Sequence, residues 1–146
     1  MTTFRGRGII AGRGRGRALV TTMPMNFTAA LTKPANVLPN RRAEIQDRHH
    51  DLYGQNIKGS VLVFPSCIGS TYTGMVLLEL MAQGHAPAAM VVGEADSLLV
   101  SGAVLAEVWF DRGIPIVEYD GGDLFESIMT GVVVDVDGGT GEIKVD

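Results

Sequence analysis

The middle of the chain shows the clearest pattern of apolar and polar positions. Residues 61–64 are apolar throughout, as in a strand buried on both faces, and residues 71–84 follow with a narrow polar stripe at helical spacing. A strand over 88–92, a helix over 97–110 and a strand over 114–119 continue the series. This β-α-β-α-β order predicts parallel strands joined by right-handed crossovers.

The flanking segments predict further strands around this centre. Residues 4–22 predict two short strands joined near Gly12, and the runs at 132–136 and 142–146 predict a closing hairpin. Residues 23–60 hold three prolines and four asparagines, which predicts an irregular but ordered excursion over the surface. Together these elements predict an α/β domain, a half-barrel with helices on one side.

Both predicted helices are more apolar than a small monomer can hide. Apolar residues make up 46% of the 146 residues, and a domain of this size buries only a limited share of its surface. We therefore expect an exposed apolar patch on the isolated fold and a subunit that docks on another protein.

Charge is divided unevenly along the chain. Residues 1–50 carry nine of the twelve Lys and Arg against two acids, a net +7, whereas residues 51–146 carry three basic and fourteen acidic residues, a net −11. A protein that coats nucleic acid would not carry so acidic a second part, so we expect no nucleic acid as partner.

The basic residues include an alternating row of arginines and glycines. Arg13, Arg15 and Arg17 share one face of a strand, and the glycines between them would let another backbone pack closely. The row is either a solvated edge strand or a basic rim that closes over a carboxylate substrate and a partner subunit. It matches neither a dinucleotide fingerprint, which opens a helix, nor an RNA-binding tract with interleaved aromatics.

Several classes of protein are disfavoured by what the chain does not contain. No apolar run reaches the roughly 18–20 residues of a membrane helix, and no secretory signal pattern begins the chain, so we expect a cytoplasmic protein with no membrane partner. The single cysteine, Cys67, is too few for an iron–sulfur cluster, which normally takes three or four thiolates.

The strongest candidate site is the connection at residues 65–71, between the central strand and its helix. Ligands in parallel sheets bind at the carboxyl ends of strands, where the N–H groups of the next helix point outward. Gly69 lets the backbone approach a ligand, and Ser70 lies at the expected helix cap. Ser70 is either an ordinary N-cap or a base whose alkoxide the same amides stabilise.

Three other residues have plainer explanations than chemistry. Cys67 is a candidate nucleophile, but a small buried residue at a strand end fits it better. His49 and His50 are candidate metal ligands, yet adjacent histidines point in different directions and no second ligand cluster follows. We interpret the two histidines as polar anchors of a loop.

The order of several short motifs resembles the small subunit, or swivel domain, of the aconitase X family. The matching segments are residues 6–27, 47–59, 61–74 (VLVFPSCIGSTYTG), 83–89, 101–103 and 111–115. Together they span about residues 5–136, and their order and spacing are more specific than any one motif.

The resemblance implies a swivelling β/β/α barrel similar to the fourth domain of aconitase, with residues 1–146 as a single domain. It implies a hydro-lyase that dehydrates a small hydroxy acid and is active only with a large subunit. That partner holds the iron–sulfur cluster, and this chain holds no metal. Ser70 matches the serine that removes the α-proton while the cluster iron assists loss of the hydroxyl, and Gly69, Thr71 and Cys67 would contact the substrate.

One departure from the family pattern bears on the substrate. Members that we associate with mevalonate 5-phosphate tend to read Gly-Arg before Gly-Ser, whereas this chain has Cys67-Ile68. The loop lacks that phosphate partner, which favours an unphosphorylated substrate such as cis-3-hydroxy-L-proline. The alternatives are the small subunit of mevalonate 5-phosphate dehydratase and a non-catalytic module that binds RNA or another anion.

Overall fold

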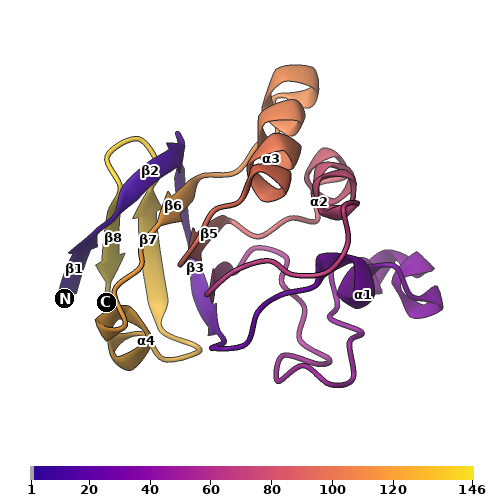
Figure 1. Ribbon diagram of the computed structural model, residues 1–146, viewed down its shortest axis with the longest axis horizontal. Coiled ribbons are helices and arrows are strands. Elements are labelled where there is room, and N and C mark those ends of the chain that lie inside the picture. Colours follow the sequence, from indigo (N-terminus) through magenta and orange to yellow (C-terminus); the bar gives the residue numbers. More distant parts are fainter. Residues whose placement is uncertain (1) are drawn as a thin grey trace.

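A computed structural model describes residues 2–146, which contain an eight-stranded sheet (Figure 1). The strands are β1 (Thr2–Arg5), β2 (Arg7–Ile10), β3 (Arg13–Val20), β4 (Val61–Phe64), β5 (Ala89–Val92), β6 (Ile116–Glu118), β7 (Val133–Asp137) and β8 (Glu142–Val145). Their order across the sheet is β1-β8-β7-β3-β4-β5-β6-β2. Strands β4 to β6 run parallel, as the sequence predicts, β3 runs parallel to β4 as well, and the remaining pairs are antiparallel.

Strands β1 and β2 are the two outermost strands in this order, and they follow each other in the chain. β1 pairs with β8 and β2 pairs with β6, although only Gly6 separates β1 from β2. Gly6 donates its N–H to Gly141 O at 2.8 Å. The chain therefore closes the sheet into a barrel, the form that the family resemblance implies, where the apolar pattern alone predicts a half-barrel.

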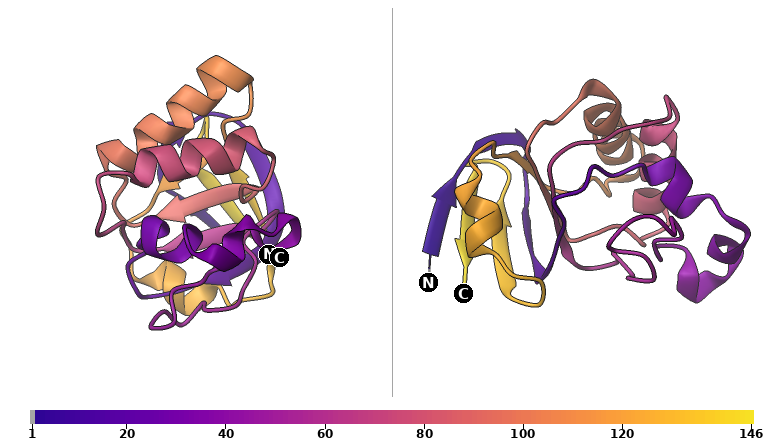
Figure 2. Two further views of the ribbon diagram at one scale, coloured as in Figure 1. Left: turned by 90° about the vertical axis from the view of Figure 1, so that its right-hand side faces the viewer. Right: turned by 60° about the horizontal axis from the view of Figure 1, so that its bottom comes forward.

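Two long helices lie side by side against the parallel strands (Figure 2). α2 (Thr73–Ala82) lies within its predicted range, and α3 (Ser97–Phe110) has its predicted bounds. Their backbones approach at two glycines, since a Cβ on Gly102 would lie 2.5 Å from Gly74 O. Four short elements were not expected from the pattern: α1 (Phe27–Leu31), η1 (Pro34–Val37), η2 (Pro39–Arg41) and α4 (Asp123–Ser127).

The parallel strands are buried on both faces, which explains their continuous apolar runs. In β4, Val61 and Val63 belong to the core inside the barrel, together with Leu124 of α4. Leu62 and Phe64 belong to a second core beneath the helices. The molecule thus has two hydrophobic cores separated by one layer of parallel strands.

Residues 23–60 are ordered, as predicted, but they are not an excursion over the surface. Phe27 of α1 is fully buried and meets Phe64 edge to face, with ring centroids 5.6 Å apart. Ile45 and Ile57 are fully buried in the same core. The prediction is wrong here because these apolar residues are spaced irregularly between prolines and asparagines, so no helical or strand period reveals them.

β3 is a central strand and not an edge strand, because it pairs with β7 on one side and β4 on the other. The prediction that its glycines admit a second backbone is confirmed: a Cβ on Gly14 would collide with Ala88 O. A glycine is required there because any side chain would push the backbones apart.

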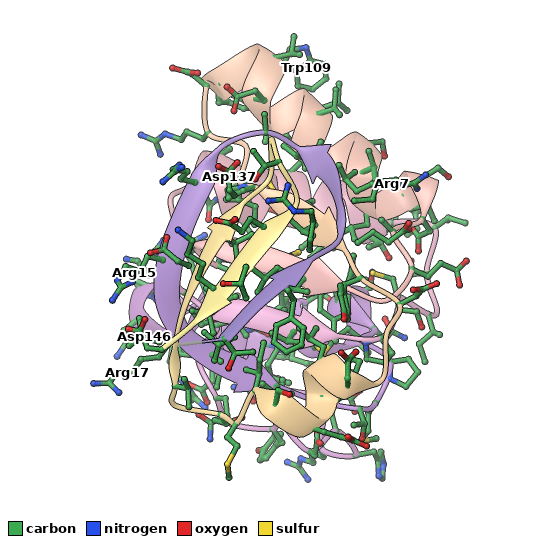
Figure 3. All side chains as sticks on the ribbon, turned by 90° about the vertical axis from the view of Figure 1, so that its left-hand side faces the viewer. Arg7, Arg15, Arg17, Trp109, Asp137 and Asp146 are labelled. Carbon is green, nitrogen blue, oxygen red and sulfur yellow. The ribbon has the colours of Figure 1, made fainter. Side chains whose placement is uncertain are left out.

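An apolar patch is exposed on the two long helices, as the sequence predicts. Its most exposed members are Met75 of α2 and Val108 and Trp109 of α3, at 66%, 71% and 61%. Trp109 lies at the end of α3 and points away from the sheet (Figure 3). Within residues 2–146, no helix is both long enough and apolar enough to cross a membrane.

Candidate functional site

The segments that follow β3 and β4 lie against each other at the carboxyl edge of the parallel strands. Met25 donates its N–H to Ser66 O at 2.9 Å, and Met25 O accepts the N–H of Ile68 at 3.0 Å. Met25 and Cys67 form an isolated parallel bridge beyond the strand ends. This pairing fixes the loop that leads into α2.

Ser70 lies in this loop, just before α2. Its Oγ accepts the N–H of Tyr72 at 2.9 Å, and its carbonyl accepts a hydrogen bond from Thr73 Oγ1 at 2.9 Å. The N-cap position belongs to Tyr72, so the prediction that Ser70 caps the helix is wrong by two residues. The hydrogen bond from the Tyr72 N–H and the nearby helix N-terminus both favour a negatively charged Ser70 oxygen.

Three consecutive N–H groups around Ser70 have no partner within residues 2–146. The amides of Gly69, Ser70 and Thr71 donate to no acceptor in the described part of the chain. Gly69 has φ +97°, a left-handed conformation that other residues rarely adopt, and Thr71 is exposed. Unpaired N–H groups next to a helix N-terminus suit an anionic oxygen, such as a carboxylate or an alkoxide.

Asn26 is part of the same site, although no motif marks it in the sequence. Its side chain lies against Gly69, where a Cβ would be 2.7 Å from Asn26 Cγ. Its Oδ1 accepts the N–H of Ala29 at 3.0 Å and so caps α1. A local signal that could have located it is the asparagine directly before the segment 27–31, because Asn is a preferred N-cap residue.

Cys67 lies in the loop but has the environment of an inert thiol. Burial, together with the nearby Asp96 carboxylate, raises the pKa of Cys67 to about 12. A thiol with this pKa is protonated at neutral pH, which makes it a poor nucleophile and a poor metal ligand. Nor do three His, Cys, Asp or Glu side chains gather as a metal site anywhere in residues 2–146. The residues of this chain therefore do not fit an iron–sulfur cluster.

The two histidines have different environments, and the interpretation of a loop anchor is confirmed for His50. His50 is buried, and its Nδ1 accepts the N–H of Leu52 at 3.1 Å and lies 3.2 Å from Asp51 Oδ1. Thr21, at the end of β3, donates its hydroxyl to the same Asp51 oxygen at 2.7 Å. His49 is exposed, and its N–H donates to Asp47 Oδ1 at 3.2 Å.

Strands β1, β2 and β3, which carry the N-terminal arginines, are called the arginine strands here. They lie in the other half of the molecule, on the side that is toward the viewer in Figure 3. Four of their arginines form ion pairs with acids of neighbouring strands or of the C-terminal end. The pairs are Arg5 with Glu142, Arg7 with Glu118, Arg13 with Asp137, and Arg15 with Asp135 and Asp146, at 2.8 to 3.3 Å. Figure 3 shows Arg15 next to Asp146. Arg17 donates instead to Gly131 O at 3.2 Å.

These ion pairs correct the hypothesis of a basic rim. Four of the nine basic residues of positions 1–50 pair with acids from residues 118–146, so the charge imbalance along the sequence is partly neutralised in space. An RNA-binding strand would need these side chains free to contact phosphates. The solvated-face interpretation is favoured, on a strand that is central.

Known proteins resemble this chain over nearly its whole length. Residues 3–145 match the family described as aconitase X swivel domain. The chain belongs to this family. Its fold also matches the crystal structure of Thermococcus kodakaraensis aconitase X in its holo-form, with a TM-score of 0.83, 31% identity, and coverage of 100% of this chain and 99% of that one.

Two kinds of curated relative accompany the swivel-domain match. The phosphomevalonate dehydratase small subunit of Thermococcus kodakarensis is 32% identical over 142 residues, covering 97% of this chain and 95% of that protein. The cis-3-hydroxy-L-proline dehydratase of Pseudomonas aeruginosa is 37% identical over 110 residues, covering 75% of this chain but only 18% of that protein. The two relatives are named for different substrates, and both are dehydratases.

Proposed function

We propose that this swivel-domain chain is the small subunit of a hydro-lyase that dehydrates a small hydroxy acid, with Ser70 as the base that removes the α-proton. Residues 1–146 form one swivel domain in this proposal. The observation that carries it is the position of Ser70 at the carboxyl edge, with its Oγ accepting the Tyr72 N–H beside three unpaired amides. The dehydratase names of the relatives support the reaction type.

The proposed reaction requires one base and one leaving group. Ser70 Oγ takes the proton from the α-carbon, the electron pair of that C–H bond forms the C=C bond, and the β-hydroxyl leaves. An alkoxide is normally too basic to persist in water, so it needs hydrogen-bond donors that are already in place. The Tyr72 N–H and the N-terminus of α2 are such donors.

We propose that a large subunit completes the active site and holds the iron–sulfur cluster, whose iron would supply Lewis-acid chemistry. This chain carries one thiol, and that thiol has a raised pKa. The exposed Met75, Val108 and Trp109 support a partner, because patches of this kind are normally covered in subunits. The hydroxyproline dehydratase relative supports it too, since the match is a small part of a longer chain.

The proposed substrate is cis-3-hydroxy-L-proline. The two segments that build the site, residues 18–32 and 61–96, contain no Lys or Arg. Ile68 is exposed at the position where members that we associate with mevalonate 5-phosphate tend to have arginine. A phosphate group would find no cationic side chain on these segments. Mevalonate 5-phosphate is the second candidate, favoured by small-subunit relatives that match 97–98% of this chain.

Co-expression with the large subunit tests the proposal. The purified complex should dehydrate cis-3-hydroxy-L-proline with a higher kcat/KM than mevalonate 5-phosphate, and the isolated swivel domain should dehydrate neither. The reverse preference would overturn the proposed substrate but not the reaction. A stable complex that dehydrates neither acid would overturn the proposed function.

A further inference from the structure

The side chain of Asn26 is held in one orientation beside the Ser70 loop. Asn26 Oδ1 accepts the N–H of Ala29 at 3.0 Å, which identifies the oxygen and leaves Nδ2 as the free end of the carboxamide. Asn26 follows β3, whereas Ser70 follows β4, and the two segments are tied together through Met25. The carboxamide is thus positioned by a cap on one side and by a strand-like pairing on the other.

The free end of this carboxamide lies directly against the residue before Ser70. Of the Asn26 side-chain atoms, Nδ2 is the nearest to the place that a Cβ on Gly69 would occupy, and it would collide with that Cβ. Nδ2 donates to no acceptor within residues 2–146, and it is not among the polar atoms sealed inside the protein. An amide that is oriented, accessible and unpaired has its donor capacity available for a ligand.

The proposed reaction requires hydrogen-bond donors near Ser70 that stabilise negative charge on the substrate. When the α-proton leaves, negative charge develops on the carboxylate attached to the α-carbon. Both substrates named for the relatives carry that carboxylate, with the leaving hydroxyl on the next carbon. The segments around the site contain no Lys or Arg, so this chain's contribution to stabilising that charge comes from neutral donors such as N–H groups.

From this juxtaposition we infer that Asn26 is a substrate-binding residue, whose Nδ2 donates to the substrate carboxylate while Ser70 removes the adjacent proton. The inference rests on the proposed function and adds the recognition of a β-hydroxy carboxylate. It assigns Asn26 two roles at once: Oδ1 caps α1 and Nδ2 binds substrate.

Two substitutions separate these roles in the complex with the large subunit. Asn, Asp and Ser are all good N-caps, so Asn26→Ser and Asn26→Asp keep an acceptor for the Ala29 N–H and remove the Nδ2 donor. Both variants should keep the thermal midpoint of the wild type within about 2 °C. Asn26→Ser should lower kcat/KM about 10- to 100-fold, as expected for loss of a hydrogen bond to a charged group. Asn26→Asp should lower it further, because its carboxylate repels that of the substrate.

The outcomes distinguish this inference from the proposed function. Wild-type kcat and KM in both variants would overturn the inference and leave Asn26 as a cap alone. A loss of activity matched by a loss of thermal stability in both variants would overturn it as well. If Asn26→Ser lowers kcat/KM and Ser70→Ala does not, the role of Ser70 fails while the Asn26 contact stands. A wild-type complex without dehydratase activity would overturn both.

Discussion

The arginine strands and the Ser70 loop differ in whether their hydrogen-bond donors have acceptors within the described residues. On β1 to β3, four arginines each meet at least one carboxylate of a neighbouring strand. In the Ser70 loop there is no cationic side chain, but three amide N–H groups and the Asn26 carboxamide have no acceptor within residues 2–146. The region with the most charge is therefore the more completely compensated one.

Whether donors are paired therefore distinguishes a candidate binding site from a structural surface better than the number of charges does. Exposed ion pairs contribute little to stability and leave few donors for a ligand. Unpaired N–H donors in the loop after a strand form no hydrogen bond that stabilises the fold, but they can bind an anion. We therefore predict that changes in the Ser70 loop lower turnover and that changes among the arginines affect it little.

Ser70→Ala should have the largest effect. Removing a general base typically costs 10²- to 10⁴-fold, and we expect a loss of about 10³-fold in kcat for the complex with the large subunit. Ser66→Ala in the same loop is the matched control and should stay within about threefold of the wild type. Equal losses in the two variants, measured by steady-state kinetics, would point to general damage of the loop.

Gly69→Ala should have the next largest effect, on stability as well as activity. The added Cβ would meet the Asn26 side chain, and φ is +97°, so we expect a loss of about 2–3 kcal/mol in the free energy of unfolding. Gly54→Ala is the control, because Gly54 has φ +84° but open space around it, and should lose about 1 kcal/mol. Urea denaturation of the two variants measures this difference, and equal losses would show that the Asn26 contact is unimportant.

Arg15→Gln should have a small effect despite its two ion pairs. The Arg15 side chain is 55% exposed, so solvent screens both contacts with Asp135 and Asp146. We expect the thermal midpoint to change by no more than about 2 °C and kcat/KM to stay within about twofold. A large fall in substrate affinity or in assembly would restore the hypothesis of a basic rim.

The smallest expected effect is a pH dependence at Asp137. The N–H groups of Thr140 and Gly139, followed by Arg13, lower the pKa of Asp137 below its ordinary value. Because the folded pKa is the lower one, this contribution to stability is present above the ordinary carboxyl pKa of about 4 and is lost as the pH falls below it. Thermal midpoints of the wild type and Asp137→Asn should therefore differ more at pH 7 than at pH 3. A constant difference would contradict the assignment.

Local sequence patterns predict the parts of the fold that local physics decides. β4 is apolar on both faces and α3 has Asp96 as its cap, so both have their predicted bounds. The loop after β4 is identifiable from the sequence as a candidate ligand site because a strand end and a helix start meet there. The expected apolar patch on the helices follows from composition alone.

Contacts between distant segments are what the sequence does not reveal. Arg15 pairs with Asp135 only after the C-terminal hairpin lies beside β3, and closure of the barrel joins β1 to β8 across the whole chain. The place of Asn26 beside Gly69 likewise depends on the pairing of Met25 with Cys67. No periodicity encodes such pairings, since they form when separate segments meet in the folded chain.

The rate at which the α-hydrogen is released reports whether Ser70 is the base. Substrate deuterated at the α-carbon, incubated with the complex of this chain and its large subunit, should lose the deuteron to water at a rate that NMR can follow. The Ser70→Ala complex should assemble and bind the same substrate but release the deuteron at least about 10³-fold more slowly. Release at the wild-type rate by Ser70→Ala would show that another group removes the proton.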